Sequence, residues 1–444
     1  MNLTVRSQRV VVPGAMAPAT IHVRDGVIAA VGAYGELMTA DVTLDVGSLV
    51  VFPGLVDTHV HVNEPGRTEW EGFAHATSAA AAGGVTTIVD MPLNSVPATT
   101  TVSALEEKRA AARGQCRVDV GFWGGVVPGN VADLPALAAA GVRGFKCFLV
   151  PSGIEEFGHV GEEDLRAAFP VLAALDLPLL VHAEAPDLLC EPVVHGPTDA
   201  RRYETWLASR PDSSERAAIE RLIALSAEFG GRVHIVHLAS AEAVPPLKHS
   251  RSGGLRVTVE TCPHYLVFSA EEIADGATAF KCAPPIRSQA NRELLWAALL
   301  DGDIDLIATD HSPAPPSLKH LSDGDFIRAW GGIASLQLSL SAVWTEAAKR
   351  DVPVFQLAEW LASAPARLAG LDAKGAIAPG KDADLVVWDP DAETKIDART
   401  LHHRHPVTPY DGRTLRGRIV TTMLRGEVVF GDGQVSGPPA GKLL

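Results

Sequence analysis

The chain has 444 residues and 47% of them are hydrophobic, enough to fill the core of one large domain together with a smaller one. Its 53 acidic and 38 basic side chains give a formal net charge of −15, which argues against nucleic acid or an anionic membrane as a partner. The five cysteines form no CxxC pair, the first residues lack the apolar run of a secretory signal, and no apolar stretch is long enough to span a bilayer, so we expect a cytoplasmic protein with free thiols.

The two ends of the chain share one sequence pattern. Residues 1–51 alternate apolar and polar side chains and are interrupted by turn residues such as Asp25-Gly26. Residues 370–444 do the same from about Gly375 onward. Both patterns are typical of short antiparallel strands. We therefore expect these two segments, 1–51 and 370–444, to meet in a small β-sandwich domain.

The middle of the chain, residues 52–369, alternates short β-rich runs with stretches of helical character, among them 102–113, 162–175 and 213–229. Eight β-rich runs can be recognised, at 50–59, 85–90, 118–123, 144–149, 177–182, 233–237, 257–260 and 306–310. Eight strands alternating with helices predict an α/β fold of the (β/α)8 TIM-barrel type. A doubly wound open sheet is the alternative.

The motif Asp57-Thr58-His59-Val60-His61 ends the first of these runs. Residues i and i+2 of a strand project from the same face, so His59 and His61 point the same way, as two imidazole ligands of one metal ion must. Most HxH pairs are surface accidents, but active sites of parallel barrels lie at the carboxyl ends of the strands. The position therefore favours a metal site.

Lys146 lies inside the apolar run 144–149. Burial disfavours an ammonium group and lowers its pKa, so this lysine could be a neutral amine able to capture CO2 as a carbamate. A carbamate carries a negative charge and two oxygens, and it can bridge two metal ions as a carboxylate does. A lysine of an edge strand that reaches solvent is the alternative.

Three further polar residues end apolar runs, namely His182, His237 and Asp310. A carboxylate in such a place is costly unless it binds a metal or a proton donor. With the HxH pair and the lysine, they put four histidines, one lysine and one aspartate at the ends of five of the eight strands, facing one mouth of the barrel. Structural or weaker substrate-contact roles are expected for the remaining histidines near these strand ends, His234, His264 and His311.

At these positions the chain resembles the cyclic amidohydrolases of the amidohydrolase superfamily, over nearly its whole length. The resemblance implies six metal ligands: His59, His61, Lys146, His182, His237 and Asp310. In that pattern Asp310 is a ligand of the more buried of two divalent ions and is also the catalytic acid and base. The carbamate of Lys146 bridges the two ions. Zinc is the expected metal, with cobalt, manganese or iron as alternatives, and a homotetramer is the expected assembly.

Within this group the chain resembles one branch most, in the stretches 63–72, 91–95, 144–148, 207–211 and 310–313, although Ala314 stands where that branch often has cysteine. Dihydroorotases, one alternative, usually carry an arginine where this chain has Asn63, which cannot form a charged fork with a carboxylate. Hydantoinases and dihydropyrimidinases, the second alternative, usually have a tyrosine in the loop after the lysine strand, and residues 150–157 contain none.

A non-catalytic scaffold of the dihydropyrimidinase-like kind is the most remote alternative, because such proteins have lost metal ligands that this chain keeps. We expect the substrate to be a small neutral cyclic amide. The candidate substrate contacts are Asn63, Asn94, Ser152 and Ser312, and the loop 284–287 is a further candidate.

Overall fold

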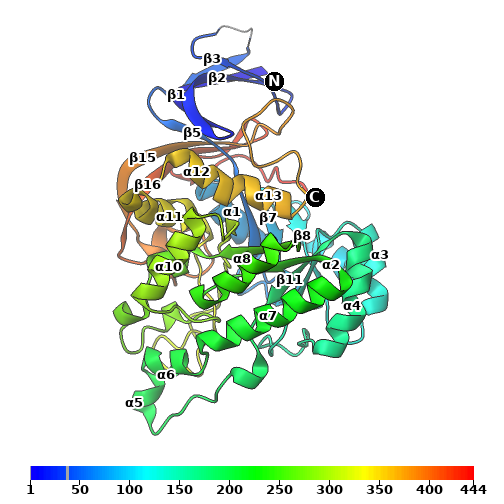
Figure 1. Cartoon of the computed structure of the whole chain (residues 1–444). Helices are drawn as coiled ribbons and strands as arrows, with labels where there is room; N and C mark the ends of the chain where they lie inside the picture. Colours follow the sequence, from blue (N-terminus) through cyan, green and yellow to red (C-terminus); the bar gives the residue numbers. More distant parts are fainter. Residues whose placement is uncertain (1, 37–39) are drawn as a thin grey trace.

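The structure is a computed structural model that describes residues 2–36 and 40–444, so residues 1 and 37–39 of the predicted N-terminal segment lie outside it. The two ends of the chain form one nine-stranded sheet, at the top of Figure 1. Its strands are β1 (Asn2–Val12), β2 (Ala15–Arg24), β3 (Val27–Ala33), β4 (Val42–Asp45), β5 (Val50–Pro53), β15 (Leu385–Lys395), β16 (Thr414–Leu424), β17 (Glu427–Gly431) and β18 (Gln434–Val435). The antiparallel pair β5–β15 joins the N-terminal strands to the C-terminal ones.

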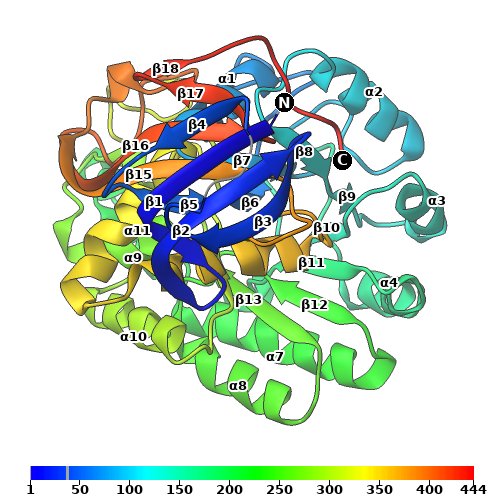
Figure 2. The same cartoon turned by 90° about the horizontal axis from the view of Figure 1, so that it is seen from above.

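The middle of the chain forms parallel strands connected by helices, which Figure 2 shows from above. These strands are β6 (Leu55–Val60), β7 (Val85–Asp90), β8 (Asp119–Phe122), β9 (Gly124–Gly125), β10 (Phe145–Phe148), β11 (Pro178–His182), β12 (Arg232–Ile235), β13 (Val257–Thr261) and β14 (Leu306–Ile307). They pair as β6-β7-β8 and as β9 through β14, and only Trp123 separates β8 from β9. A parallel bridge between Val60 and His311 brings the chain after β14 back beside β6.

The helices that surround these strands in Figure 1 include the three predicted ones, found as α2, α4 and α7. The α-helices are α1 (Phe73–Ala82), α2 (Val102–Ala112), α3 (Leu134–Ala139), α4 (Glu162–Leu175), α5 (Pro197–Ala200), α6 (Tyr203–Ala208), α7 (Asp212–Phe229), α8 (Val244–Ser252), α9 (Pro263–Val267), α10 (Gln289–Leu300), α11 (Ser339–Ala347), α12 (Val354–Ala358) and α13 (Ala364–Leu368). Among the described residues, no helix combines the length and the apolar character needed to cross a membrane.

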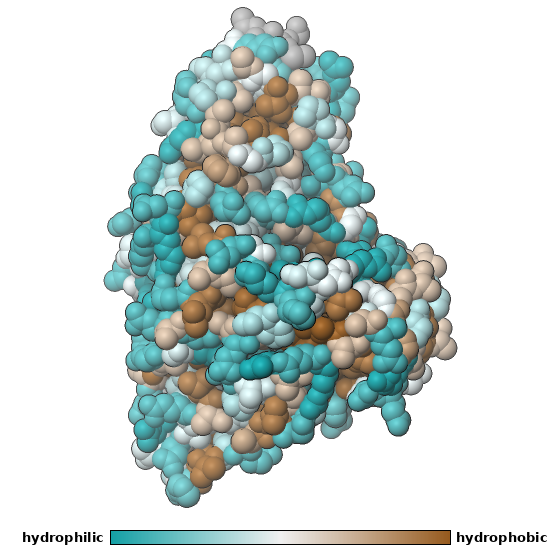
Figure 3. Space-filling model, viewed as in Figure 1, coloured by the Kyte–Doolittle hydropathy of each residue, from teal (hydrophilic) through white to brown (hydrophobic). Residues whose placement is uncertain are grey.

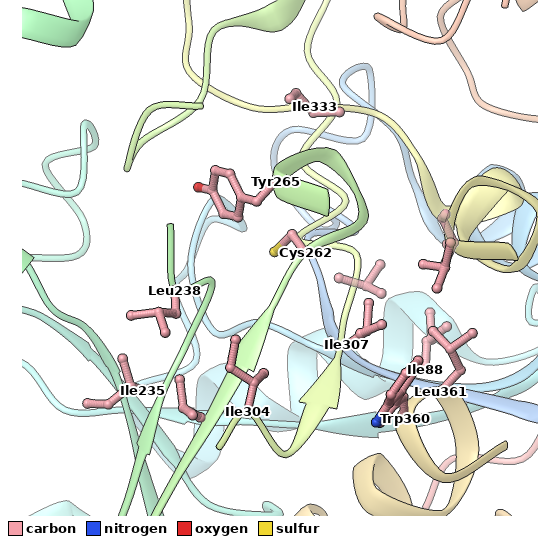
Figure 4. Packing of buried hydrophobic residues seen from close by; sticks show 14 of the residues in the cluster. Ile88, Ile235, Leu238, Cys262, Tyr265, Ile304, Ile307, Ile333, Trp360 and Leu361 are labelled. Atoms are coloured by element: carbon pink, nitrogen blue, oxygen red, sulfur yellow. The ribbon is translucent and has the colours of Figure 1, made fainter. Parts of the chain in front are cut away.

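Apolar side chains from the strands and the helices form one large core. Figure 4 shows Ile88, Ile235 and Ile307, which belong to β7, β12 and β14, in the same cluster as Trp360 and Leu361. All of these side chains are buried. On the face drawn in Figure 3, hydrophilic residues predominate and apolar groups are scattered among them. The hydrophobic effect therefore acts on a core that spans sheet and helices.

One strand differs from the prediction. The run 50–59 is not a single strand, because Val50–Pro53 is β5, which pairs with β1 and β15 in the terminal sheet, and the parallel strand β6 starts only at Leu55. Gly54 separates the two, where a Cβ atom would collide with Thr86 and Asp384. The amino end of β6 thus lies next to the terminal sheet, and its carboxyl end carries the HxH motif away from it.

Candidate metal centre

Five of the six predicted metal ligands lie at or just beyond the carboxyl ends of four parallel strands, and Lys146 lies within a fifth strand. Their positions are His59 in β6, His61 after β6, Lys146 in β10, His182 at the end of β11, His237 after β12 and Asp310 after β14. Five of them line one cavity of ≈ 220 Å³. Lys146 is fully buried, with its Nζ 4.8 Å from the ring centre of Phe148, which also lines this cavity. The structure thus brings the predicted ligand residues together.

Three of these residues form a compact ligand group. The Nε2 atoms of His59 and His61 lie 3.1 and 3.3 Å from Oδ1 of Asp310, and one ligand atom from each residue lies within 4.8 Å of the others. Asp310 has a positive φ of 46°, a conformation that non-glycine residues adopt rarely and that often occurs at functional sites. The group offers two imidazoles and a carboxylate to one cation.

His237 connects this group to His182. Its ring centre lies 5.5 Å from that of His59 and 4.6 Å from that of His182, and its φ of 41° is also positive. Nδ1 of His237 is buried without a hydrogen-bond partner in the described part of the chain. Burial, with the nearby His182, lowers the pKa of His237 well below its ordinary value. A neutral imidazole is the form that binds a metal ion.

Lys146 has the environment that a neutral amine requires. Its Nζ finds no hydrogen-bond partner among the residues that the structure describes. Burial lowers its pKa to about 8, although Asp310 and Glu260 act in the opposite direction. A buried amine without a hydrogen-bond partner, near His182, His237 and Asp310, fits a lysine that is chemically modified or bound to a cation.

Two buried glutamates hold the histidines in place. Glu260 contacts Nδ1 of His59 with one oxygen and lies 3.0 Å from Nε2 of His234 with the other, and Glu184 lies 2.7 Å from Nε2 of His182. These contacts leave Nε2 of His59 and Nδ1 of His182 free to face the centre. Burial would raise the pKa of Glu260, but the two histidines lower it to about 2, so it is a carboxylate.

Neither glutamate was assigned a role from the sequence. Glu260 ends the run 257–260 as Asp310 ends its own run, and Glu184 follows a strand that ends in histidine, so both carry the same signal of a carboxylate at a strand end. Other cavity residues that the sequence did not single out are Phe148, Trp206, Arg210, Lys281 and Trp330. His234 contacts Glu260 rather than the cavity, in keeping with the supporting role expected of it.

Of the four predicted substrate contacts, Asn94, Ser152 and Ser312 line the cavity. Asn63 is not among the lining residues. It is 1% exposed, and its amide donates a hydrogen bond to the carbonyl of Pro313 at 3.4 Å. The backbone turns sharply there, at a φ of 67°, which directs the side chain into the protein.

The remaining candidates lie outside the cavity. Arg287, in the candidate loop 284–287, forms a buried ion pair with Glu215, 2.7 Å away. His264 is fully buried. His311 accepts a hydrogen bond from the backbone of Ser335. Arg287 and His311 therefore support neighbouring elements, whereas neither ring nitrogen of His264 has a hydrogen-bond partner among the described residues.

A second acidic group, formed by Asp119, Asp382 and Asp384, has ligand atoms close together. The ammonium of Lys374 already occupies it, at 2.6 Å from Asp119 and 2.8 Å from each of the other two. This cluster is therefore an ion-pair network rather than a cation site.

Comparisons with known proteins show the family to which the chain belongs. Residues 50–429 match the model of the amidohydrolase family. An allantoinase of Streptomyces avermitilis is 50% identical over 100% of this chain and 98% of its own, and an allantoinase of Saccharomyces cerevisiae is 45% identical over 99% and 98%. Among solved structures, an L-hydantoinase (dihydropyrimidinase) from Arthrobacter aurescens superposes with a TM-score of 0.92, at 31% identity, over 100% of this chain and 99% of its own.

The chain belongs to the amidohydrolase family, as a metal-dependent enzyme that hydrolyses cyclic amides, and this family implies a binuclear metal centre. Its similarity to these relatives over the whole length of the chain places it with the allantoinases of that family.

Proposed function

We propose that this enzyme opens the ring of allantoin and releases allantoate. The observation that carries the proposal is the similarity to allantoinases along the full length of both chains. The order of the parallel strands, with the bridge that brings the chain after β14 back beside β6, supports a (β/α)8 barrel with the cavity at its carboxyl mouth, where the active sites of such barrels lie.

We assign the ligands of two divalent cations, expected to be zinc, to the six residues of the centre. His59, His61 and Asp310 would hold one cation, as their mutual distances support. His182 and His237 would hold the other, and Lys146, carboxylated by CO2, would add an anionic ligand to the centre. When bound, the cations supply an activated water as nucleophile and polarise the ring carbonyl.

Asp310 moves the proton in this proposal. Burial would raise its pKa, but His59 and His61 hold it well below its ordinary value, so the group enters the reaction as a carboxylate. It accepts the proton of the attacking water and passes it to the ring nitrogen that leaves. Its position at the cavity wall, within reach of both histidines of the HxH motif, suits this transfer.

The cavity suits a neutral ring better than an anionic one. Arg210 is paired with Glu184, and the ammonium of Lys281 contacts backbone carbonyls. Arg328, the third cation of the lining, has a side chain that is 68% exposed. A carboxylate such as that of dihydroorotate would therefore find little free, buried positive charge. Since Asn63 does not line the cavity, its effect on substrate choice is indirect.

The test is a turnover panel with metal-loaded enzyme and four compounds: allantoin, hydantoin, dihydrouracil and dihydroorotate. We expect kcat/KM for allantoin to exceed that for hydantoin and dihydroorotate by at least about a hundredfold. A pocket that forms hydrogen bonds with the ureido group is left with unpaired polar groups when a ring without that group binds. Equal turnover of hydantoin or dihydrouracil would move the enzyme to the hydantoinases, the alternative that the structural neighbour favours.

Two further expectations remain predictions. A homotetramer is expected from the family resemblance, and sedimentation of the purified enzyme would test it. A cytoplasmic location is expected from the sequence, and fractionation of the producing cells would test it.

A further inference from the structure

One residue of the cavity wall also touches the support of a predicted metal ligand. Arg210, which follows α6, lines the cavity with a side chain that is 17% exposed. Its Nη1 atom contacts Oε2 of Glu184. The same oxygen lies 2.7 Å from Nε2 of His182. A single carboxylate oxygen thus connects the guanidinium at the cavity to an imidazole of the metal centre.

Glu184 depends on Arg210 for its charge balance. The carboxylate is fully buried, and its other oxygen, Oε1, has no hydrogen-bond partner among the described residues. In the part of the chain that the structure describes, its ion pairs are those with Arg210 and His182 alone. A buried carboxylate is costly unless it is paired. Because a metal ion binds a neutral imidazole, the positive charge that balances Glu184 comes from Arg210.

Arg210 is itself held in place from two sides. Its guanidinium lies over the ring of Trp206, 4.8 Å from the ring centre, and the indole N–H of Trp206 donates to the carbonyl of Cys282 at 3.0 Å. The backbone carbonyl of Arg210 accepts a hydrogen bond of 3.1 Å from Arg287, which pairs with the buried Glu215. An ion pair whose members are already fixed costs less conformational entropy to hold.

The orientation of His182 requires this support. Its ring stacks on that of Phe148, with the ring centres 4.6 Å apart and 16° between the planes. Stacking fixes the plane of the ring, but a half-turn within that plane would exchange the positions of nitrogen and carbon atoms at no loss of the stack. The contact of Nε2 with Glu184 selects one of the two orientations and leaves Nδ1 for a ligand role.

We infer that Arg210 is a positioning residue of the metal centre, which fixes His182 through Glu184 and thereby sets the affinity for one of the two cations. That cation is the one assigned to His182 and His237, so the inference rests on the proposed function for this assignment. Arg210 needs no contact with the cation or with the substrate for this role. The loss of such an indirect partner typically weakens metal binding by about 10- to 100-fold.

The first experiment measures metal content by elemental analysis after dialysis against graded chelator, in the wild type, Arg210→Met and Arg210→Lys. In Arg210→Met, one cation per chain should be lost at an about tenfold lower chelator concentration than in the wild type. The other cation should be kept, because its ligand His59 is held by Glu260 instead. Arg210→Lys retains the charge without the planar fork and should recover part of the difference. Equal weakening of both cations, or of neither, would overturn the inference.

Arg350→Met is the matched control. The side chain of Arg350 is 19% exposed, lies 4.7 Å from the ring centre of Trp296 and pairs with Glu293 and Glu346. None of these residues lines the cavity. We expect this variant to keep both cations as tightly as the wild type. A control that loses a cation together with Arg210→Met would show that any missing arginine ion pair loosens the centre, which would contradict a specific role of Arg210.

The second experiment asks whether Arg210 acts through Glu184. If it does, Arg210→Met combined with Glu184→Gln should lose the cation at the same chelator concentration as Glu184→Gln alone, within about twofold. A further loss of about tenfold in the double variant would overturn this path. The double variant buries no unpaired carboxylate, so the comparison decides the matter even where Arg210→Met alone fails to fold.

Both readouts need no substrate, so they are separate from the turnover panel. Wild-type enzyme that leaves allantoin intact would refute the proposed function, while the pattern of metal loss would still decide the role of Arg210. Wild-type enzyme that binds fewer than two cations per chain would overturn the assignment of His182 and His237, and the role of Arg210 with it.

Discussion

Two histidines of the metal centre, His59 and His182, each have one ring nitrogen held by a buried glutamate, which leaves the other nitrogen for a ligand role. Glu260 serves two histidines at once, because one of its oxygens contacts His59 and the other His234. His234 is held in turn by Thr258, 2.8 Å from its Nδ1. Such partners orient a metal ligand and raise its basicity.

We therefore expect Glu260→Gln to weaken metal binding about 10- to 100-fold, because the amide lacks the charge that strengthens His59 as a ligand. Metal content after dialysis against graded chelator would measure this. Glu215→Gln is the matched control, since Glu215 is an equally buried carboxylate that pairs with Arg287. A Glu260 variant that keeps its metals as tightly as this control would contradict the role.

The chemistry-bearing residues could be predicted where they interrupt an apolar run, as Lys146 and Asp310 do. The partners of Glu260 could not be predicted, because they lie on the other strands β6 and β12. The sequence of β13 does not tell which side chains of those strands contact Glu260. The cavity residues Trp330 and Lys281 belong to irregular segments without periodicity, where contacts depend on the folded loop alone.

At the scale of elements, the centre depends on how closely neighbouring strands approach. Lys146 on β10 pairs in register with Leu180 of β11. Gly144, just before β10, lies so near β11 that a Cβ atom would be 2.7 Å from the carbonyl oxygen of Pro178 and 2.9 Å from the indole of Trp123. The position of Lys146 thus depends on an unsubstituted backbone two residues earlier.

Gly144→Ala should force β10 and β11 apart, lower the stability by about 1–3 kcal/mol as overpacking does, and reduce bound metal. Calorimetry and elemental analysis would measure the two effects. Gly114→Ala is the control, because Gly114 also has a positive φ, of 73°, but has no atom within 4 Å of a Cβ. Equal effects of the two substitutions would show that backbone conformation, rather than the approach of the strands, matters.

The elements were predictable to different degrees. The helix expected at 162–175 is α4 with the same bounds, because an acidic first turn and an apolar stripe mark it. The division between β5 and β6 was missed because the apolar residues continue on both sides of Gly54, and only pairing with β15 shows that the first part belongs to another sheet. Pairing between distant segments leaves no mark in the local pattern.

At the scale of the whole molecule, Lys374 joins the terminal sheet to the parallel strands. Its ammonium contacts Asp119, the first residue of β8, and Asp384, the residue before β15. Arg425 also pairs with Asp119, whose other oxygen accepts the amide N–H of Lys442 at 2.7 Å. The network therefore holds the C-terminal strands against the layer that carries the metal centre.

Lys374→Met should destabilise the protein by about 3–5 kcal/mol, because it leaves three carboxylates, two of them buried, without their shared cation.

The pH dependence of this loss follows from the pKa of Lys374. Burial would lower that pKa, but Asp384 and Asp119 raise it well above its ordinary value. A pKa that is higher in the folded state stabilises the protein in full below the unfolded value of about 10.4, and the gain fades as the pH rises beyond it. The difference in Tm between wild type and variant should thus be constant from about pH 7 to 9 and shrink above about pH 10.5. Lys349→Met removes an exposed lysine whose partner Glu346 keeps a second cation, Arg350, so it should change Tm little at any pH. A Lys374 variant that melts with the wild type at neutral pH would show that the terminal sheet is held by its apolar contacts alone.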